Sequence, residues 1–268
     1  MKYARAVAFR GYVTSQSTGH ATRSTTGAMH FEIAGDSVIE SILKPVNSHS
    51  GPKLLVNELV STEIAYRIGL PAPEPYIVDV PPKLEIPLRH RPGVMAPGPN
   101  FAVPYFRVSM APAENEHIAL ADNQDDLPGI VAFDTWMGNR DRTTPGNLVA
   151  TPSTREPGWF HIWMVDHGHA FTGPNWTAES LLEEAESVRA LPYPDVLAEP
   201  MENARWLSKW LGRITAVDEE TVTEVVEKVP LSWLPQRDER RALVTYIVRR
   251  RDFLVAALAE LSVQSLAS

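Results

Sequence analysis

One segment of the sequence, residues 133–171, constrains the fold more tightly than any other part of the chain. Its pattern predicts a helix that ends at Gly138, a polar loop that contains Asp141 and Asn147, and a strand that runs up to Asp166. A loop followed by a strand can bring these three polar side chains together although they are separated along the chain. The segment therefore predicts a site in which two carboxylates and an amide meet.

The three side chains of this segment suit the chemistry of phosphoryl transfer. Such a transfer needs few protein groups, but they must be held in fixed relative positions. One carboxylate accepts the proton of the acceptor hydroxyl, while an amide and a second carboxylate hold Mg²⁺ on the phosphates of ATP. Since Mg²⁺ prefers hard oxygen ligands, we interpret Asp141 as the general base and Asn147 and Asp166 as the metal ligands.

Two other interpretations of this segment stay open. Asp, Asn, Thr, Pro and Gly are all turn formers, so the loop could be a polar turn that only caps structure. Alternatively, Asp166, His167 and His169 could form a metal site with His161, as in metal-dependent hydrolases. The sequence contains no H-E-x-x-H helix that would support a hydrolase.

The spacing of Asp141 and Asn147, followed by the triplet Asp166-His167-Gly168, resembles the catalytic loop and metal-binding triplet of the protein-kinase superfamily. In detail, NRDRTTPGN and VDHGHAF are more similar to the HipA-like bacterial kinases and the lipid-kinase branch than to eukaryotic protein kinases. The resemblance implies a two-lobed α+β fold of the protein-kinase type, with a strand-rich N-lobe and a mainly helical C-lobe. It also implies ATP and Mg²⁺ in the cleft between the lobes, and transfer of the γ-phosphoryl group to a hydroxyl.

The first half of the chain carries the same resemblance. The stretch SVIESILKP places Lys44 at the end of an apolar strand, and NELVSTEIAYRIGLPAP is similar to the helix after the kinase lysine. By that resemblance, Lys44 contacts the α- and β-phosphates of ATP, and Glu58 on the helix pairs with Lys44. A buried lysine needs such a partner. Lys53 is the alternative lysine and Glu63 the alternative partner.

A Ser-, Thr- and Gly-rich stretch, Thr14–Ala28, precedes these elements and predicts a loop. In a kinase-like fold this loop would cover the phosphates of ATP, where backbone amides and small side chains can approach closely. The resemblance assigns nucleotide contacts to Ser24, Thr25, Thr26 and Gly27. The hydroxyls of the loop are also candidate autophosphorylation sites, and a polar linker is the alternative interpretation.

The sequence departs from the common kinase pattern at three places. The usual HRD triplet reads Asn139-Arg140-Asp141, and the loop that follows it has one residue more than the common spacing. His167 stands where the metal-binding triplet usually has Phe, and no G-x-G-x-x-G loop is present. These departures keep open a pseudokinase, a nucleotide-binding regulator without turnover, as the alternative to an active kinase.

We expect residues 1–108 to form the N-lobe and residues 109–268 to form the C-lobe, with the boundary near Met110–Glu114. The helix after Lys44 should end at Gly69. The other expected helices are Leu127–Gly138, Glu179–Arg189, Glu202–Ile214, Glu219–Val229 and Arg237–Leu261. The expected strands are Ala28–Ala34, Val38–Lys44, Tyr76–Val80, Phe101–Val108, Leu148–Ala150 and His161–Val165.

The composition narrows the cellular context. The 268 residues contain no cysteine, which excludes disulfides, thiolate metal sites and thiol nucleophiles. A net charge of −8 argues against direct nucleic-acid binding, and no run approaches the roughly 20 apolar residues that span a bilayer. We therefore expect a cytoplasmic protein without membrane contact, which binds a nucleotide and an unknown hydroxyl acceptor, a protein or a small molecule.

Overall fold

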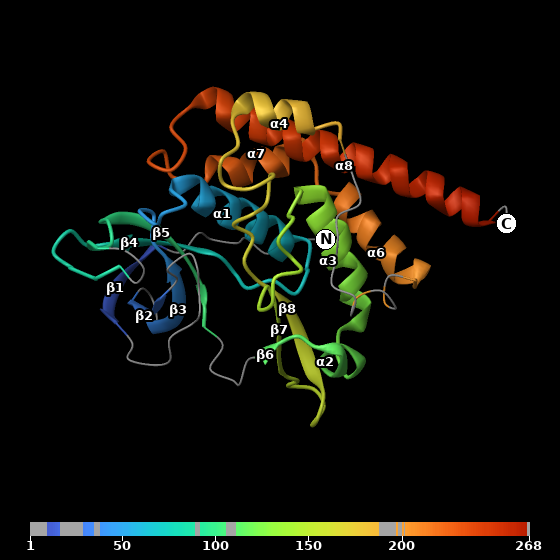
Figure 1. Cartoon of the computed structure of the whole chain (residues 1–268), viewed down its shortest axis with the longest axis horizontal. Helices are drawn as coiled ribbons and strands as arrows, with labels where there is room; N and C mark the ends of the chain where they lie inside the picture. Colours follow the sequence, from blue (N-terminus) through green and yellow to red (C-terminus); the bar gives the residue numbers. More distant parts are fainter. Residues whose placement is uncertain are drawn as a thin grey trace.

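The chain folds into two lobes, one built from strands and one built mainly from helices (Figure 1). This computed structural model describes residues 10–16, 29–34, 38–88, 92–105, 111–187, 197, 200 and 202–266. The strands β1 to β5 lie at one end of the molecule, most helices lie at the other, and helix α1 lies between them. The expected α+β organisation is therefore confirmed.

The strand-rich lobe is a closed barrel in which the strand order is β1-β2-β3-β5-β4. All neighbouring strands are antiparallel except β1 and β4, which are parallel. Because the barrel closes on itself, the sheet has no unpaired edge. The strands are β1 (Arg10–Gln16), β2 (Met29–Ala34), β3 (Val38–Lys44), β4 (Tyr76–Val80) and β5 (Gly98–Pro104).

The predicted hairpin before Lys44 is present as β2 and β3, which pair from Met29↔Leu43 to Ala34↔Val38. The turn at residues 35–37 lies outside the described residues. A small apolar cluster fills this lobe and includes residues from the proline-rich segment between β4 and β5. Its members are Leu43, Tyr76, Val78, Val80, Ile86, Met95 and Ala102.

Helix α1 runs from Pro52 to Arg67 and corresponds to the helix predicted after Lys44. Pro52 stands at the start, where a missing backbone N–H costs nothing. Gly69 follows the end with a φ of 78°, a conformation that glycine adopts readily. Every residue from Leu54 to Ala65 is buried. A helix buried on all sides is a core element, so α1 contacts both lobes.

One large apolar core holds the helical lobe together and extends to α1. Its largest fully buried side chains are aromatic: Trp136, Trp210, Trp233, Tyr246, Phe133 and Phe171. A small sheet, order β6-β7-β8, lies beside α2 and α3 (Figure 1). The elements of this lobe are β6 (Ala111–Pro112), α2 (Asn115–Ala119), η1 (Gln124–Asp126), α3 (Leu127–Met137), β7 (Leu148–Pro152), β8 (Phe160–Met164), α4 (Ala178–Glu184), α6 (Ala204–Thr215), α7 (Glu219–Glu227) and α8 (Arg237–Leu266).

Several predicted elements begin or end a few residues from their expected bounds, and for two of them the structure shows the cause. The strand expected at Phe101–Val108 is β5, which begins earlier because Gly98 pairs with Val80 of β4. The helix expected at Glu179–Arg189 already ends at Glu184. Arg250 of α8 donates hydrogen bonds to the carbonyl of Glu184 and to that of Ser187, at 3.2 and 2.8 Å. A side chain from another helix thus takes the place of the next helical turn.

The packing of α3 on α6 requires a glycine at position 129. A Cβ atom at Gly129 would lie 2.4 Å from Cδ2 of Trp210. We expect Gly129→Ala to lower the free energy of unfolding by about 1–3 kcal/mol, because the indole or the helix has to move. Chemical denaturation of the purified variant measures the change.

Gly212→Ala in α6 is the matched control, since a Cβ atom there meets nothing within 4 Å. This variant should gain about 0.5–1 kcal/mol, because alanine loses less backbone entropy in a helix than glycine does. Equal stability of the two variants would contradict the described contact between α3 and α6.

Candidate active site

A buried cluster of three charged side chains joins the two lobes. Lys44, at the end of β3, places Nζ 2.5 Å from Oε1 of Glu58 on α1 and 3.0 Å from Oδ1 of Asp166 after β8. Lys44 and Glu58 are only 6% and 2% exposed, so both charges are shielded from water. The structure therefore contains the ion pair expected from the sequence, and it adds Asp166 as a second partner of the lysine.

Burial and mutual attraction oppose each other in this cluster. Burial alone would lower the pKa of Lys44, but the charges of Asp166 and Glu58 outweigh it and raise that pKa above its usual range. Burial would raise the pKa of Asp166, whereas the charge of Lys44 holds it well below the usual range. For Glu58 burial is the stronger influence, and it raises the pKa to about 7 against the attraction of Lys44. Two carboxylates thus share one lysine, and Glu58 is the one that takes up a proton more readily.

Asp166 has a backbone conformation that few residues other than glycine adopt. Its φ is 58°, in the left-handed region, and its Oδ1 accepts the backbone N–H of Gly168 at 3.4 Å. Gly168 is pressed against α1, because a Cβ atom there would lie 2.6 Å from Cδ1 of Leu54 and 3.1 Å from Oε1 of Glu58. Strained residues of this kind concentrate at functional sites.

Two side chains of α1 hold His167, the residue that follows Asp166. Glu58 accepts the backbone N–H of His167 with Oε2 at 3.1 Å. Thr62, one turn further along the same side of the helix, places Oγ1 3.2 Å from Nδ1 of the histidine. The ring is buried against Phe133, and burial lowers the pKa of His167 well below its usual value. A neutral histidine therefore fills the position at which the resemblance expects a phenylalanine.

Asn57 is a positioning residue that the sequence interpretation missed. Its amide nitrogen donates to the carbonyl oxygens of Gly168 and Ala170, both at 2.9 Å, and its Oδ1 accepts from Nε1 of Trp176 at 2.8 Å. The side chain is fully buried. One signal in the sequence could have identified Asn57: it is an amide directly before Glu58, and most of the other residues in this part of the helix are apolar.

A second buried ion pair stabilises the loop between α3 and β7. Arg142 donates from Nε to Oδ2 of Asp134 at 2.7 Å and from Nη2 to Oδ1 at 3.1 Å. Its Nη1 donates to the carbonyl oxygens of Asn147 and Val165. Asn139 also donates to Oδ1 of Asp134, at 2.9 Å. Arg142, which the sequence interpretation also missed, thus ties the loop to the strand that leads to the site.

Asp141 lies half-buried in this loop, and two side chains orient its carboxylate. Thr144 donates to Oδ1 at 2.6 Å, and Asn147 donates from Nδ2 to Oδ2 at 2.9 Å. Because Asn147 uses its amide nitrogen on Asp141, its amide oxygen is the atom that suits a metal ion. The backbone N–H of Val165 donates to the carbonyl of Asn147 at 3.0 Å. This bond places Asn147 beside the end of β8, where Asp166 follows.

The alternative lysine and glutamate have other partners. Lys53 forms an ion pair with Glu239 of α8 at 2.6 Å. Glu63 pairs with Arg67 at 2.8 Å and with Lys228 at 3.0 Å. The structure therefore assigns Lys44 and Glu58, and not Lys53 and Glu63, to the cluster at the junction of the lobes.

The histidines considered for a hydrolase site do not converge on Asp166. His161 places Nδ1 2.7 Å from Oδ1 of Asp122, His167 faces Thr62, and His169 is exposed. Among the residues that the structure describes, no three acidic or histidine side chains are grouped so that they could hold a metal ion. The geometry therefore does not support the hydrolase alternative.

The first residues of the loop predicted at Thr14–Ala28 belong to a strand instead. Thr14–Gln16 form the end of β1, which pairs with β2 in the barrel. Ser24, Thr25, Thr26 and Gly27 lie outside the described residues. The loop thus connects two neighbouring strands, and the nucleotide contacts of its residues remain a prediction.

A strand barrel, a buried lysine–glutamate pair on β3 and α1, and a carboxylate directly after a β-hairpin together define the class of protein-kinase-like folds. The family model described as HipA-like kinase matches residues 42–257. The chain belongs to this family. The matched range contains the residues Lys44, Glu58, Asp141, Asn147 and Asp166.

Two solved structures are similar to this chain. The Helicobacter pylori proinflammatory kinase CtkA matches with a TM-score of 0.62 and 13% identity, over 96% of this chain and 99% of CtkA. At this identity the likeness shows a shared fold, which is the two-lobed kinase-like fold. Hydra Fam20, solved with sugar, matches with a TM-score of 0.48 and 11% identity, over 96% of this chain and 87% of Fam20.

No curated protein matches the sequence. Within the described part of the chain, none of the helices combines the length and the apolar character needed to cross a membrane. The family match shows the family of this chain, and the likeness to CtkA shows its fold.

The pair between Asp134 and Arg142 should be the strongest single support of the loop. We expect Arg142→Met to lower the free energy of unfolding by about 3–5 kcal/mol, because the carboxylate of Asp134 is left buried without a cation. The double variant with Asp134→Asn should recover part of this loss, since the remaining group is neutral. Urea denaturation of the single and double variants gives both values.

Lys209→Met provides the control. It removes a pair with Asp125 in which the side chains are 36% and 47% exposed, and a longer contact of 3.5 Å with Asp126. Because the lysine is exposed, the cost should stay near or below about 1 kcal/mol. If Arg142→Met were no more costly than Lys209→Met, the loop would not depend on the buried pair.

Proposed function

We propose that this chain is an ATP- and Mg²⁺-dependent phosphotransferase that moves the γ-phosphoryl group of ATP to a hydroxyl. The observation that carries the proposal is the buried cluster of Lys44, Glu58 and Asp166, which gathers one cation and two carboxylates between the lobes. Membership of the HipA-like kinase family supports the same class of reaction. The acceptor we propose is a Ser or Thr hydroxyl of a protein, with a small-molecule hydroxyl as the alternative in a substrate screen.

The side chains of the cluster fit a bound Mg²⁺. Two carboxylates, those of Glu58 and Asp166, share the single charge of Lys44. Burial raises the pKa of Glu58 to about 7 and the charge of Asp166 adds to this effect, so the site favours an added cation. Asp166 and the amide oxygen of Asn147 supply hard oxygen ligands, which Mg²⁺ prefers. When bound, Mg²⁺ would neutralise charge on the β- and γ-phosphate oxygens.

The protein groups have separate roles in this proposal. Lys44, held by Glu58, binds the α- and β-phosphates. Asp141 accepts the proton of the acceptor hydroxyl. As it does so, the oxygen of the acceptor bonds to the γ-phosphorus of ATP, and the bond between the γ-phosphorus and the oxygen that bridges it to the β-phosphate breaks. Thr144 and Asn147 keep the carboxylate of Asp141 oriented for this step.

The nucleotide lies, in this proposal, between an N-lobe of residues 1–108 and a C-lobe of residues 109–268. The strand pairing supports this proposal, since β2, which follows the loop, pairs with both β1 and β3. The loop between β1 and β2, with Ser24, Thr25, Thr26 and Gly27, covers the phosphates, and β3 carries Lys44. Backbone amides and small side chains in such a loop can approach phosphate oxygens closely.

Asp166→Ala tests the metal site. We expect Mg²⁺-dependent binding of a nonhydrolysable ATP analogue to weaken by at least about 100-fold, because a ligand of the ion is lost. Calorimetric titration with and without Mg²⁺ measures the effect. Asp125→Ala, at a position with an exposed side chain, should bind the analogue like the wild type. Normal Mg²⁺-dependent binding by Asp166→Ala would refute the assignment.

Asp141→Asn separates catalysis from binding. The variant should bind the Mg²⁺–ATP analogue like the wild type and transfer phosphate about 10²–10⁴-fold more slowly, because the general base is lost. Transfer from γ-labelled ATP, including to the protein itself, is the readout. A wild-type protein that binds the analogue and transfers no label to any acceptor would support the pseudokinase alternative.

A further inference from the structure

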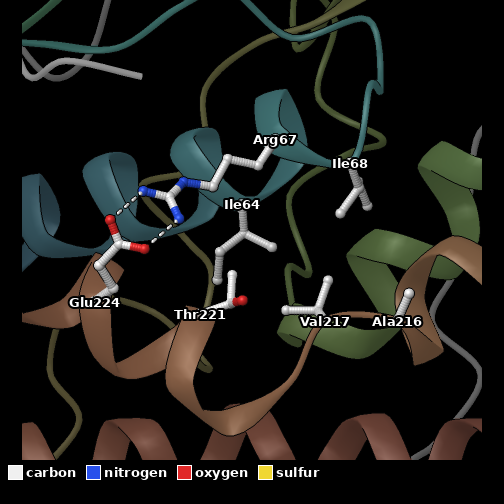
Figure 2. Close-up of a pocket in the computed structure, with 7 residues that line it drawn as sticks. All are labelled: Ile64, Arg67, Ile68, Ala216, Val217, Thr221 and Glu224. Atoms are coloured by element: carbon white, nitrogen blue, oxygen red, sulfur yellow. Dashed lines mark hydrogen bonds and ion pairs between the residues drawn. The ribbon is translucent and has the colours of Figure 1, made fainter. Parts of the chain in front are cut away.

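A cavity of about 130 Å³ lies on the other side of α1, away from the charged cluster. Figure 2 shows Ile64 of α1 and Ile68, directly after α1, pointing into this space. Ala216 and Val217 from the connection between α6 and α7, and Thr221 from α7, face them. An ion pair between Arg67 and Glu224 borders the cavity on one side.

The walls of this cavity are mainly apolar and already formed. Ile64, Ile68 and Val217 are 1%, 8% and 5% exposed, so the packing of the two elements fixes their positions. A dry apolar cavity of about 150 Å³ in another protein binds benzene. We propose that the cavity between α1 and the α6–α7 connection is a binding site for a neutral small molecule with an aromatic or branched aliphatic group of about the size of benzene.

The charges at the border favour a neutral ligand. Arg67 uses Nε on Glu63 at 2.8 Å, and it uses Nη1 and Nη2 on the two oxygens of Glu224 at 3.0 and 3.3 Å. Glu63 also pairs with Lys228 at 3.0 Å. These four side chains carry two positive and two negative charges. An anion would have to displace Glu224, and a cation would meet Arg67. The hydroxyl of Thr221 donates to Asp218, and its oxygen can still accept a hydrogen bond from a neutral ligand.

This site is separate from the proposed nucleotide site. None of the residues that line the cavity belongs to the charged cluster. Ile64 and Ile68 follow Glu58 by six and ten positions in α1, which corresponds to about 9 and 15 Å along a helix. The proposal therefore does not depend on the proposed function, and a ligand in the cavity should not compete with ATP.

Fluorine NMR of 4-fluorophenol, a neutral probe, tests the proposal on the full chain. We expect saturable binding with a dissociation constant of about 0.1–3 mM, as suits a ligand of about eight non-hydrogen atoms. Ala216→Leu extends a side chain into the cavity and should weaken binding at least about tenfold. Thr221→Leu fills the cavity from the facing element and should have the same effect. Ala204→Leu, an exposed position at the other end of α6, should bind like the wild type.

Three results would overturn the proposal. The first is the absence of saturable binding, and the second is equal binding by the wild type and the two cavity-filling variants. The third is displacement of 4-fluorophenol by Mg²⁺–ATP, which would place the probe in the nucleotide cleft. The anion 4-fluorobenzoate should bind at least about fivefold more weakly than 4-fluorophenol, and tighter binding of the anion would refute the neutral class of ligand.

Discussion

Buried charge is the constraint on which the arrangement of the two lobes depends. An isolated charge in a protein interior costs several kcal/mol, so neither Lys44 nor Glu58 could be buried alone. Asp166, whose side chain is 29% exposed, lies at the edge of the same group. Lys44 comes from β3, Glu58 from α1, and Asp166 from the segment after β8. Each element therefore supplies the partner that makes the burial of the others tolerable. The lobes are joined at the same point at which we propose that the nucleotide binds.

The helical lobe contains a second buried ion pair with a different balance. Asp134 and Arg142 carry one charge of each sign, and the remaining N–H groups of the arginine are satisfied by the carbonyl oxygens of Asn147 and Val165. A fully satisfied network of this kind rigidifies its surroundings. In the cluster at Lys44 two carboxylates share one lysine, and burial, together with the charge of Asp166, raises the pKa of Glu58 to about 7. The pair of Asp134 and Arg142 therefore serves to hold the loop in place. The cluster of Lys44, Glu58 and Asp166, with two carboxylates and one cation, would be stabilised further by a second cation.

The sequence predicted those features that leave a local pattern. Gly138 ends α3, and β2 and β3 pair as predicted before Lys44. Both features depend on signals that lie within a few residues, a glycine at the end of a helix and short apolar runs in strands. Asn57 escaped prediction because the groups that it holds are mainly backbone carbonyls of a distant segment, which have no side-chain signature. Arg142 escaped because its pair with Asp134 and its bonds to the carbonyls of Asn147 and Val165 form only when the loop is folded. The carbonyls that Asn57 holds are more than 100 residues away. The early end of α4 escaped for a similar reason, since it depends on a side chain of α8.

Helix α1 carries charged side chains on two sides, and the two sides differ in how far these charges are buried. Towards the site, Glu58 lies in a buried network in which the loss of one partner leaves an uncompensated charge. On the side of the cavity, Arg67 pairs with Glu224, whose side chain is 60% exposed. The side chain of Arg67 is only 14% exposed and also pairs with Glu63, so charges of both signs are balanced at this border. A neutral ligand in the cavity can therefore leave these pairs, and the cluster on the other side of the helix, intact.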